Sequence, residues 1–179
     1  MKKLFILFAL MAMMLPAAAQ HIIVLKTDNG IQAVDFLMGK REVGENVTII
    51  GGGLTGCEIA YELYLQGKKP TIVEMQDDLI TTPGICLANT SFLRDFFKAN
   101  NVPVHLETGV CEILDDGVEV KDKNGTKFKI AADSVILSTG DKSAPLAPKG
   151  KHIHLVGDCD KVGNLRTVIW QAWDVAMKL

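Results

Sequence analysis

The middle of the chain alternates between short, wholly apolar runs and stretches in which apolar residues recur at helical spacing. Residues 47–50 form a continuous β-branched run that ends at once in glycines, which is typical of a strand buried on both faces. The next apolar residues repeat at i, i+3, i+4 and i+7 and predict a helix face packed on a sheet. The residues of this face are Cys57, Ala60, Tyr61 and Tyr64. Gly67 ends the helix and residues 70–75 form a second apolar run, so the order is β-α-β.

The pattern changes after this unit. Residues 89–101 predict a second helix that Asn89 or Thr90 can cap. Its apolar stripe consists of Phe92, Leu93, Phe96 and Phe97. Short runs with turn residues between them then occupy residues 102–107, 110–114, 117–122 and 126–131. Because Asn124-Gly125 is a strong hairpin signal, we expect these runs to form a small antiparallel meander.

The C-terminal part returns to longer elements. Residues 133–140 predict a buried strand that ends at Gly140, and residues 142–150 form a connection rich in proline and glycine. Residues 152–160 predict one more strand, and residues 164–179 predict a helix. One side of this helix carries Leu165, Val168, Ile169, Ala172 and Ala176. Together the elements predict an α/β fold with a central parallel sheet, flanking helices and an inserted antiparallel meander.

The N-terminal residues have a different character. Lys2 and Lys3 precede an apolar run at residues 4–15, which a proline and small residues up to Ala19 follow. This is the layout of a secretory signal that is cleaved after Ala19, and it predicts an exported or periplasmic protein. The run is shorter than the roughly 20 residues that span a bilayer core, so we expect no permanent membrane anchor. A buried N-terminal segment of a cytoplasmic protein is the alternative.

A lead-in segment separates this signal from the main domain. Residues 21–27 are rich in β-branched residues and suit a short strand. Residues 31–40 predict a helix that ends at Gly39, as a C-terminal glycine would end it.

Composition narrows the classes of function. The chain has 179 residues, of which 48% are hydrophobic and 22% charged, enough for one ordinary core. A formal net charge of −2 without a basic block disfavours nucleic acid as a partner. His152 and His154 alternate on a predicted strand, but two ligands are too few for a metal site. The cysteines lack C-x-x-C spacing, and we expect most of them to be small buried hydrophobes. They are Cys57, Cys86, Cys111 and Cys159.

The loop between the first strand and its helix carries the candidate chemistry. Gly51, Gly53 and Gly56 match G-x-G-x-x-G, with Gly52 as an additional glycine. A strand before the glycines and a helix after them are the context in which this spacing indicates dinucleotide binding. The three glycines allow a tight turn, the approach of a pyrophosphate, and close packing of helix on sheet. Glycines that serve only a turn are the alternative. The expected cofactor-binding positions of the loop are Gly51, Gly52, Gly53, Leu54, Thr55 and Gly56.

Glu74 stands at the end of the second strand, where an acidic residue accepts hydrogen bonds from an adenosine ribose. A carboxylate there disfavours a 2′-phosphate, and residues 75–78 offer no arginine to neutralise one. The sequence therefore predicts NAD as the cofactor, with NADH preferred over NADPH.

Three stretches, residues 47–75, 133–146 and 154–179, carry a resemblance to a known family. Together they resemble the NAD(P)-binding domain of the two-dinucleotide-binding-domain flavoproteins. The likeness is closest to the C-terminal half of old-yellow-enzyme-like NADH:flavin oxidoreductases, the 2,4-dienoyl-CoA reductase and enoate reductase type. It covers about residues 25–179 and implies a Rossmann-like FAD/NAD(P)-binding fold.

The resemblance also implies roles for residues outside the glycine loop. Asp158, with Gly157 beside it, matches the carboxylate that binds the ribityl part of FAD. Gly140 joins the cofactor-binding positions, and Glu58 matches an acidic position near the meeting point of nicotinamide and flavin. Taken without the family, Gly157 and Asp158 are a turn before a helix, and Glu58 is an exposed helix carboxylate.

The departures from the family shape the functional hypotheses. A second G-x-G-x-x-G for FAD is absent, and neither a flavin-binding barrel nor an iron–sulfur cysteine cluster fits in residues 1–46. We therefore expect a signal at 1–19, a lead-in at 20–45, an NAD(P)-binding domain at 46–141 and a tail of an FAD domain at 142–179. The leading hypothesis is an NADH-binding domain that needs a flavoprotein partner chain for a complete FAD site and for substrate. A truncated or degenerate exported domain without catalysis is the alternative, and a reading frame that continues upstream is a third.

Overall fold

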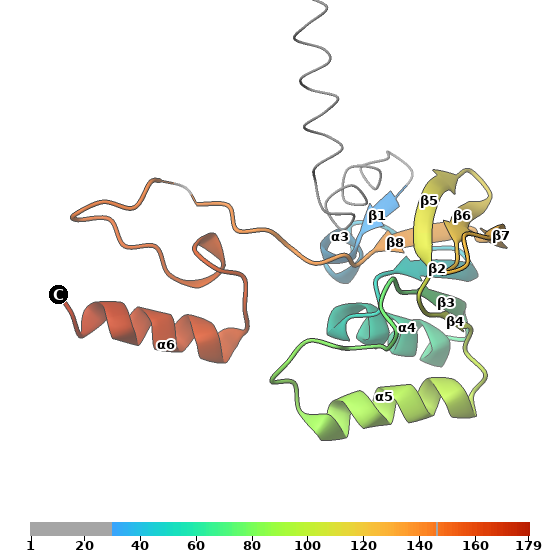
Figure 1. Ribbon diagram of the computed structural model, residues 1–179, viewed down its shortest axis with the longest axis horizontal. Helices are drawn as coiled ribbons and strands as arrows, with labels where there is room; N and C mark the ends of the chain where they lie inside the picture. Colours follow the sequence, from blue (N-terminus) through green and yellow to red (C-terminus); the bar gives the residue numbers. More distant parts are fainter. Residues whose placement is uncertain (1–29, 146) are drawn as a thin grey trace, which may run out of the picture. The chain divides into compact units, whose positions relative to one another are not determined.

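A computed structural model describes residues 30–145 and 147–179 of the chain (Figure 1). The signal expected at residues 1–19 and the β-rich run at 21–27 lie outside the described residues. The chain forms two compact units, of which the first ends at Thr139 and the second comprises Gly140–Leu179. Among the described residues, each helix is too short or too polar to cross a lipid bilayer.

The first unit is built on a five-stranded parallel sheet. Its strands, in spatial order, are β1 (Gly30–Gln32), β8 (Ser134–Leu137), β2 (Asn46–Ile50), β3 (Lys69–Val73) and β4 (Val104–His105). The central strand β2 pairs in parallel with both neighbours, so that Thr48 lies opposite Thr71 on one side and Val135 on the other. All strands of such a sheet end at the same edge, which is where dinucleotides bind in this architecture.

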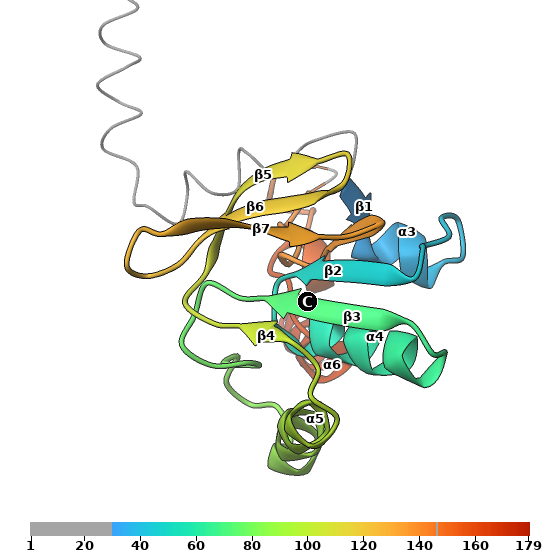
Figure 2. The ribbon, with the colours of Figure 1, turned by 90° about the vertical axis from the view of Figure 1, so that its right-hand side faces the viewer.

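Helices cover one face of this sheet. They are α3 (Ala33–Leu37), α4 (Leu54–Leu65) and α5 (Leu87–Ala99). Figure 2 shows α4 and α5 on the side of β2, β3 and β4 that faces away from the small antiparallel sheet. The core between helices and sheet is mainly apolar, and its most deeply buried side chains include Ile49, Leu63, Ile72, Phe97 and Ile136. The fold is therefore the predicted Rossmann-like α/β dinucleotide-binding fold.

A three-stranded antiparallel meander covers the opposite face. It consists of β5 (Gly109–Leu114), β6 (Gly117–Lys121) and β7 (Lys127–Ala131). Val118 and Val120 of β6 pack with Val73, Val135 and Leu137 of the parallel sheet in a second apolar core. At the predicted hairpin, Gly125 has a φ of +85°, a conformation that favours glycine. The Asp122 carboxylate accepts the N–H groups of Asn124 and Thr126 there.

Three predicted boundaries are wrong. Residues 102–107 belong to the parallel sheet instead of the meander, because Val104 and His105 pair with Ile72 and Val73. Residues 31–40 are not one helix, since Ile31 and Gln32 pair with β8 in strand β1.

The second helix also begins earlier than predicted. Its N-cap is Cys86, which provides no side-chain hydrogen bond, and the expected caps Asn89 and Thr90 lie inside the helix. The Thr90 hydroxyl donates to the carbonyl oxygen of Leu87 at 3.1 Å and so caps no N–H group.

The buried face of α4 differs from the predicted face. Cys57 and Ala60 are buried as expected, together with Gly56, Ile59 and Leu63. Tyr61 and Tyr64 instead point to α5, where both rings meet Phe96 edge-on at centroid distances of 4.7 and 5.3 Å. Helix α4 therefore packs on two neighbours. Its buried residues face the sheet, and its tyrosines contact α5.

The second unit holds the 3-10 helix η1 (Gly157–Cys159) and helix α6 (Leu165–Ala176). The strand predicted at 152–160 is wrong, because within this unit the segment forms only an isolated bridge between Gly150 and Ile153. The predicted C-terminal helix is confirmed. Asn164 caps it by accepting the N–H of Thr167, whose hydroxyl accepts the N–H of Asn164 in return.

Candidate dinucleotide-binding site

The site begins where β2 ends and the chain turns sharply at Gly51. The N–H of Gly51 donates to the carbonyl oxygen of Val73 at 2.8 Å, and its φ of +107° suits only glycine. A side chain at this position would place its Cβ 2.2 Å from the carbonyl oxygen of Ser138 in the loop after β8. The turn therefore runs in direct contact with the neighbouring strand end and leaves no room for a side chain.

Gly56 serves helix packing. A Cβ at Gly56 would lie 2.0 Å from the carbonyl oxygen of Gly51, so α4 passes directly over the turn. Gly53 is different, because its backbone is extended with φ −68° and ψ 179°, and a Cβ there would meet no atom within 4 Å. The fold requires glycine at 51 and 56, whereas the space beside Gly53 is open for a ligand to approach the backbone.

The N-terminus of α4 faces this open space. Gly53 is the N-cap and offers no side-chain cap, and the first turn contains no acidic residue. Cys57 is the first residue whose N–H bonds within the helix, to Gly53 at 3.0 Å. The preceding N–H groups, those of Leu54, Thr55 and Gly56, have no acceptor in the described part of the chain. Free N–H groups at the positive end of a helix dipole fit an anionic pyrophosphate.

Glu74 follows β3 directly, at the strand end that the sequence predicted, and contacts the glycine loop. Its Oε2 accepts the N–H of Gly52 at 2.6 Å, and its Oε1 accepts the N–H of Gln76 at 2.9 Å. Each carboxylate oxygen keeps a second lone pair, so the half-buried group can accept hydroxyl protons as well. Two backbone bonds thus fix its orientation at the position expected for a ribose ligand.

The sequence predicted Gly52 as a cofactor-binding position, but its packing role was missed. A Cβ there would lie 2.5 Å from Leu79 Cδ2 and 3.0 Å from Glu74 Cβ. The carbonyl oxygen of Gly52 accepts the N–H of Ile80 at 2.8 Å. The segment after β3 therefore folds over Gly52 and contacts both of its backbone polar groups.

The other predicted site residues are exposed or belong to the second unit. Glu58 is exposed and is the fifth residue of α4. Gly140 begins the second unit with a φ of +82° and is exposed.

Gly157 and Asp158 lie in the 3-10 turn of the second unit. Gly157 has a φ of +69°, and its N–H donates to Gln171 Oε1 at 2.7 Å. The exposed Asp158 accepts the N–H of Gly163 with Oδ1 at 3.1 Å, while its Oδ2 has no partner among the described residues. A side chain at Gly157 would meet Val168 of α6 at 3.2 Å. The turn and the start of α6 are thus tied together, with one carboxylate oxygen left to the outside.

A protein-family model described as "Pyridine nucleotide-disulphide oxidoreductase" matches residues 14–155. The chain belongs to this family. Pyridine nucleotide-disulphide oxidoreductases bind FAD and NAD(P), which agrees with the glycine loop and free helix terminus of the first unit.

The chain is also similar to individual members of known enzyme groups. The chain is 39% identical over 158 residues to a cinnamate reductase of Clostridium sporogenes, covering 85% of this chain and 24% of that protein. It is 34% identical over 158 residues to an NADH oxidase of Thermoanaerobacter brockii, covering 83% of this chain and 24% of that protein. A solved 2-naphthoyl-CoA reductase superposes with a TM-score of 0.75 at 25% identity, covering 87% of this chain and 24% of that one. The chain thus spans about a quarter of the length of each relative.

Cys57 follows Gly56 directly and is the thiol nearest in sequence to the glycine loop. Burial, followed by the nearby Glu74 charge, raises the pKa of Cys57 to about 12, so the thiol stays protonated at neutral pH. Contrary to expectation, only Cys57 is fully buried, whereas Cys86 is exposed and Cys111 and Cys159 are half-buried. In residues 30–145 and 147–179 no cluster of three or more potential metal ligands occurs.

Proposed function

We propose that the chain is an NADH-binding domain of a flavin-dependent oxidoreductase of the enoate reductase type. In this proposal residues 46–141 bind the nicotinamide dinucleotide, and residues 142–179 are the tail of an FAD-binding domain. One observation carries it: the open space at Gly53 lies beside the unpaired N–H groups at the start of α4, and Glu74 stands at the adjacent strand end.

Each part of this arrangement has a specific task. The N–H groups of Leu54, Thr55 and Gly56 donate to the pyrophosphate, and the Glu74 carboxylate accepts the hydroxyl protons of the adenosine ribose. The bound nicotinamide supplies the hydride, and the protein binds and orients it. Gly51 and Gly56 keep the turn and helix in contact, so that the free N–H groups face the open space.

A preference for NADH over NADPH follows from the charge of Glu74. Its carboxylate is fixed by the N–H groups of Gly52 and Gln76, so it cannot swing away from an incoming 2′-phosphate without losing two hydrogen bonds. Electrostatic repulsion between the two anions would then oppose NADPH.

A flavoprotein partner would complete the FAD and substrate sites. Two features of the second unit support this part of the proposal. Asp158 has an outward carboxylate oxygen, and α6 buries none of its residues while exposing Leu165, Ile169, Trp170 and Trp173. The related proteins are much longer than this chain, which agrees with a function shared among several domains. Export directed by residues 1–19 is likewise part of the proposal.

Binding to the purified full chain tests the core of the proposal. Titration calorimetry with NADH should show saturable binding at or below millimolar concentrations, and circular dichroism should confirm that the chain is folded. A folded chain that binds no NADH at these concentrations would contradict the proposal. NADH-dependent reduction of added FAD, abolished by Gly53→Val, would separate a functional domain from a degenerate one that only keeps the fold.

A further inference from the structure

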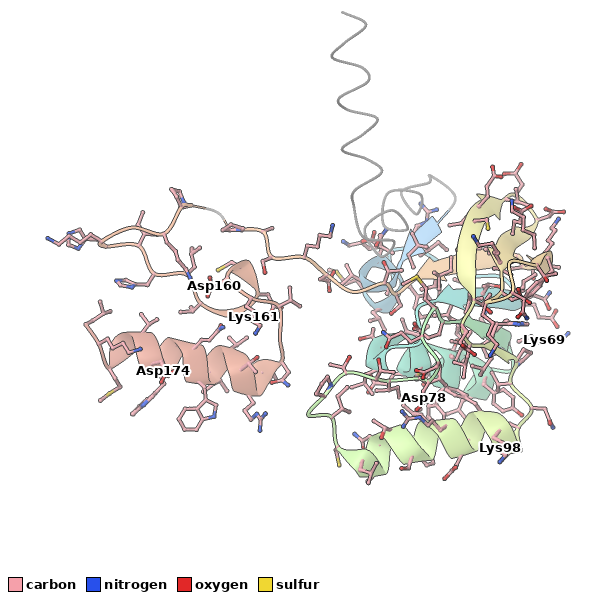
Figure 3. All side chains as sticks on the ribbon, viewed as in Figure 1. Lys69, Asp78, Lys98, Asp160, Lys161 and Asp174 are labelled. Atoms are coloured by element: carbon pink, nitrogen blue, oxygen red, sulfur yellow. The ribbon has the colours of Figure 1, made fainter. Side chains whose placement is uncertain are left out.

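Arg94 of α5 reaches back to the segment that joins β3 to α5. Its Nε donates to Asp78 Oδ1 at 3.0 Å and its NH2 group lies 2.9 Å from Asp78 Oδ2, so the pair is bidentate. The same NH2 group donates to the carbonyl oxygen of Leu79. Figure 3 labels Asp78 in this segment, above α5. These hydrogen bonds from Arg94 hold the pKa of the Asp78 carboxyl below its usual range.

The segment that Arg94 holds is the one that closes over the glycine loop. Ile80, two residues after Asp78, donates its N–H to the carbonyl oxygen of Gly52 at 2.8 Å. Ile80 is buried with a φ of +51°, which is uncommon for a β-branched residue and persists only where contacts impose it. Residues 74–80 thus form one continuous segment. Arg94 holds it at Asp78, and Glu74 and Ile80 connect it to Gly52.

Arg94 is therefore a cation in the neighbourhood of the expected ribose site. Its NH2 group donates to the carbonyl oxygen of Leu79, and the side chains of Leu79 and Glu74 both lie against Gly52. The sequence showed no arginine in residues 75–78, but the fold brings one to the segment from α5. Its side chain is 30% exposed, so solvent or a ligand can reach it.

We propose that Asp78 is a specificity-determining residue, which withholds the Arg94 guanidinium from the 2′-phosphate of NADPH by binding it in a bidentate pair. This inference rests on the proposed dinucleotide function and deepens it. Glu74 repels a 2′-phosphate, and Asp78 forms an ion pair with Arg94, the cation that would otherwise attract one. Cofactor choice then depends on two carboxylates, of which only Glu74 stands at the strand end that the sequence pattern indicates.

The geometry predicts what Asp78→Asn would do. The amide oxygen can still accept the N–H of Leu79, which donates to Asp78 Oδ1 at 2.7 Å in the native chain. An amide NH2 in place of Oδ2 would face the NH2 group of Arg94 and form no hydrogen bond, because both groups are donors. The loop contact is kept, and Arg94 can still donate to the amide oxygen and to the carbonyl oxygen of Leu79. It loses the contact with Oδ2 and the carboxylate charge that neutralises it, so its positive charge becomes available to a 2′-phosphate.

The test compares NADPH and NADH affinities of full-length variants by calorimetry or by fluorescence of the bound nicotinamide. Asp78→Asn should raise NADPH affinity about tenfold relative to NADH, as expected for one gained charge-assisted hydrogen bond. Adding Arg94→Met in the same chain should cancel the gain. Asp95→Asn is the matched control, because Asp95 is an exposed carboxylate next to Arg94 in sequence, whereas the guanidinium forms its ion pair with Asp78.

The outcomes separate the two proposals. If the native chain binds NADH but Asp78→Asn leaves the ratio of affinities unchanged, the role of Asp78 is overturned and the proposed function stands. If Asp95→Asn shifts the ratio as much as Asp78→Asn does, net charge alone explains the effect and the inference again fails. If the folded native chain binds neither nucleotide, the proposed function fails and the inference fails with it. Circular dichroism of every variant identifies a chain that has not folded, and for such a chain Asp78→Ser replaces Asp78→Asn.

Discussion

Glu74 and Gly52 are joined by a 2.6 Å hydrogen bond between the carboxylate and the backbone N–H. The bond connects the end of β3 to the loop after β2, the two segments that hold the adenosine ribose and the pyrophosphate of a dinucleotide in this fold. Because the carboxylate is already oriented by the protein, little rearrangement is needed when a ribose binds. The same bond gives Glu74 a structural role beside the binding role proposed for it.

The first prediction follows from this double role. Glu74→Gln should lower NADH affinity about tenfold, since a ribose hydroxyl loses a charged acceptor. It should also cost about 1 kcal/mol of unfolding free energy, because the amide NH2 cannot accept one of the two backbone N–H groups. Calorimetry and urea unfolding measure the two effects. The control is Asp77→Asn, an exposed carboxylate in the same loop, and equal losses in both variants would contradict the assigned role.

A pair of glycine variants separates folding from binding. Gly56→Ala should destabilise the chain by about 3 kcal/mol, because the new Cβ would lie 2.0 Å from a backbone oxygen that cannot move freely. Gly53→Ala meets no atom within 4 Å and should change stability by less than about 0.5 kcal/mol. Its effect should appear instead in NADH affinity, with a loss of about tenfold if the methyl group blocks one charged contact of the pyrophosphate. A large loss of stability in Gly53→Ala would show that the open space is filled by protein.

The alternation of apolar runs was sufficient to predict the layered fold. The continuous run at 47–50 and the glycines after it indicate a buried strand and a turn, and both depend on local sequence. The strand predicted at 152–160 failed because a strand needs a neighbour, and an apolar run by itself does not show whether one exists. The prediction that residues 102–107 belong to the meander failed because their partner strand is β3, which lies far away in sequence.

The residues of the candidate site also divide into those that local sequence predicts and those that only tertiary packing brings together. The positions of Gly51, Gly56 and Glu74 could be predicted from spacing alone, because the turn, the helix and the strand end belong to one β-α-β unit. Arg94 could not, because α5 meets the loop after β3 only through tertiary packing. The packing role of Gly52 was equally hidden, since the atoms that exclude a side chain there come from Glu74 and Leu79.

The Cys57 thiol gives a prediction for alkaline pH. Its pKa is about 12 in the folded chain and 9.0 as the ordinary value, so between these values the unfolded state releases a proton that the folded state keeps. The contribution of Cys57 to the unfolding free energy should therefore be fully present below pH 9.0, and it should fall as the pH rises above that value.

Paired cysteine variants test this assignment. Urea unfolding at several pH values should give a flatter alkaline decline for Cys57→Ala than for the native chain. At neutral pH this variant should be less stable by about 1 kcal/mol, owing to the lost sulfur contacts. The exposed Cys86 is the control, and Cys86→Ala should keep the native decline. Identical slopes for Cys57→Ala and the native chain would show that other groups cause the alkaline loss.

The two tryptophans of the chain, Trp170 and Trp173, both lie on α6 and are 60% and 57% exposed. An aromatic side chain that buries little surface contributes little to folding, so Trp173→Ala should change the unfolding free energy by less than about 0.5 kcal/mol. Phe97, which is 1% exposed in the core beneath α5, is the comparison, and Phe97→Ala should cost about 3 to 5 kcal/mol. Iodide should quench the tryptophan fluorescence of the isolated chain almost as well as that of free indole. If Trp173→Ala instead destabilises the chain as strongly as Phe97→Ala, α6 is packed within the isolated chain and does not present its apolar side to a partner.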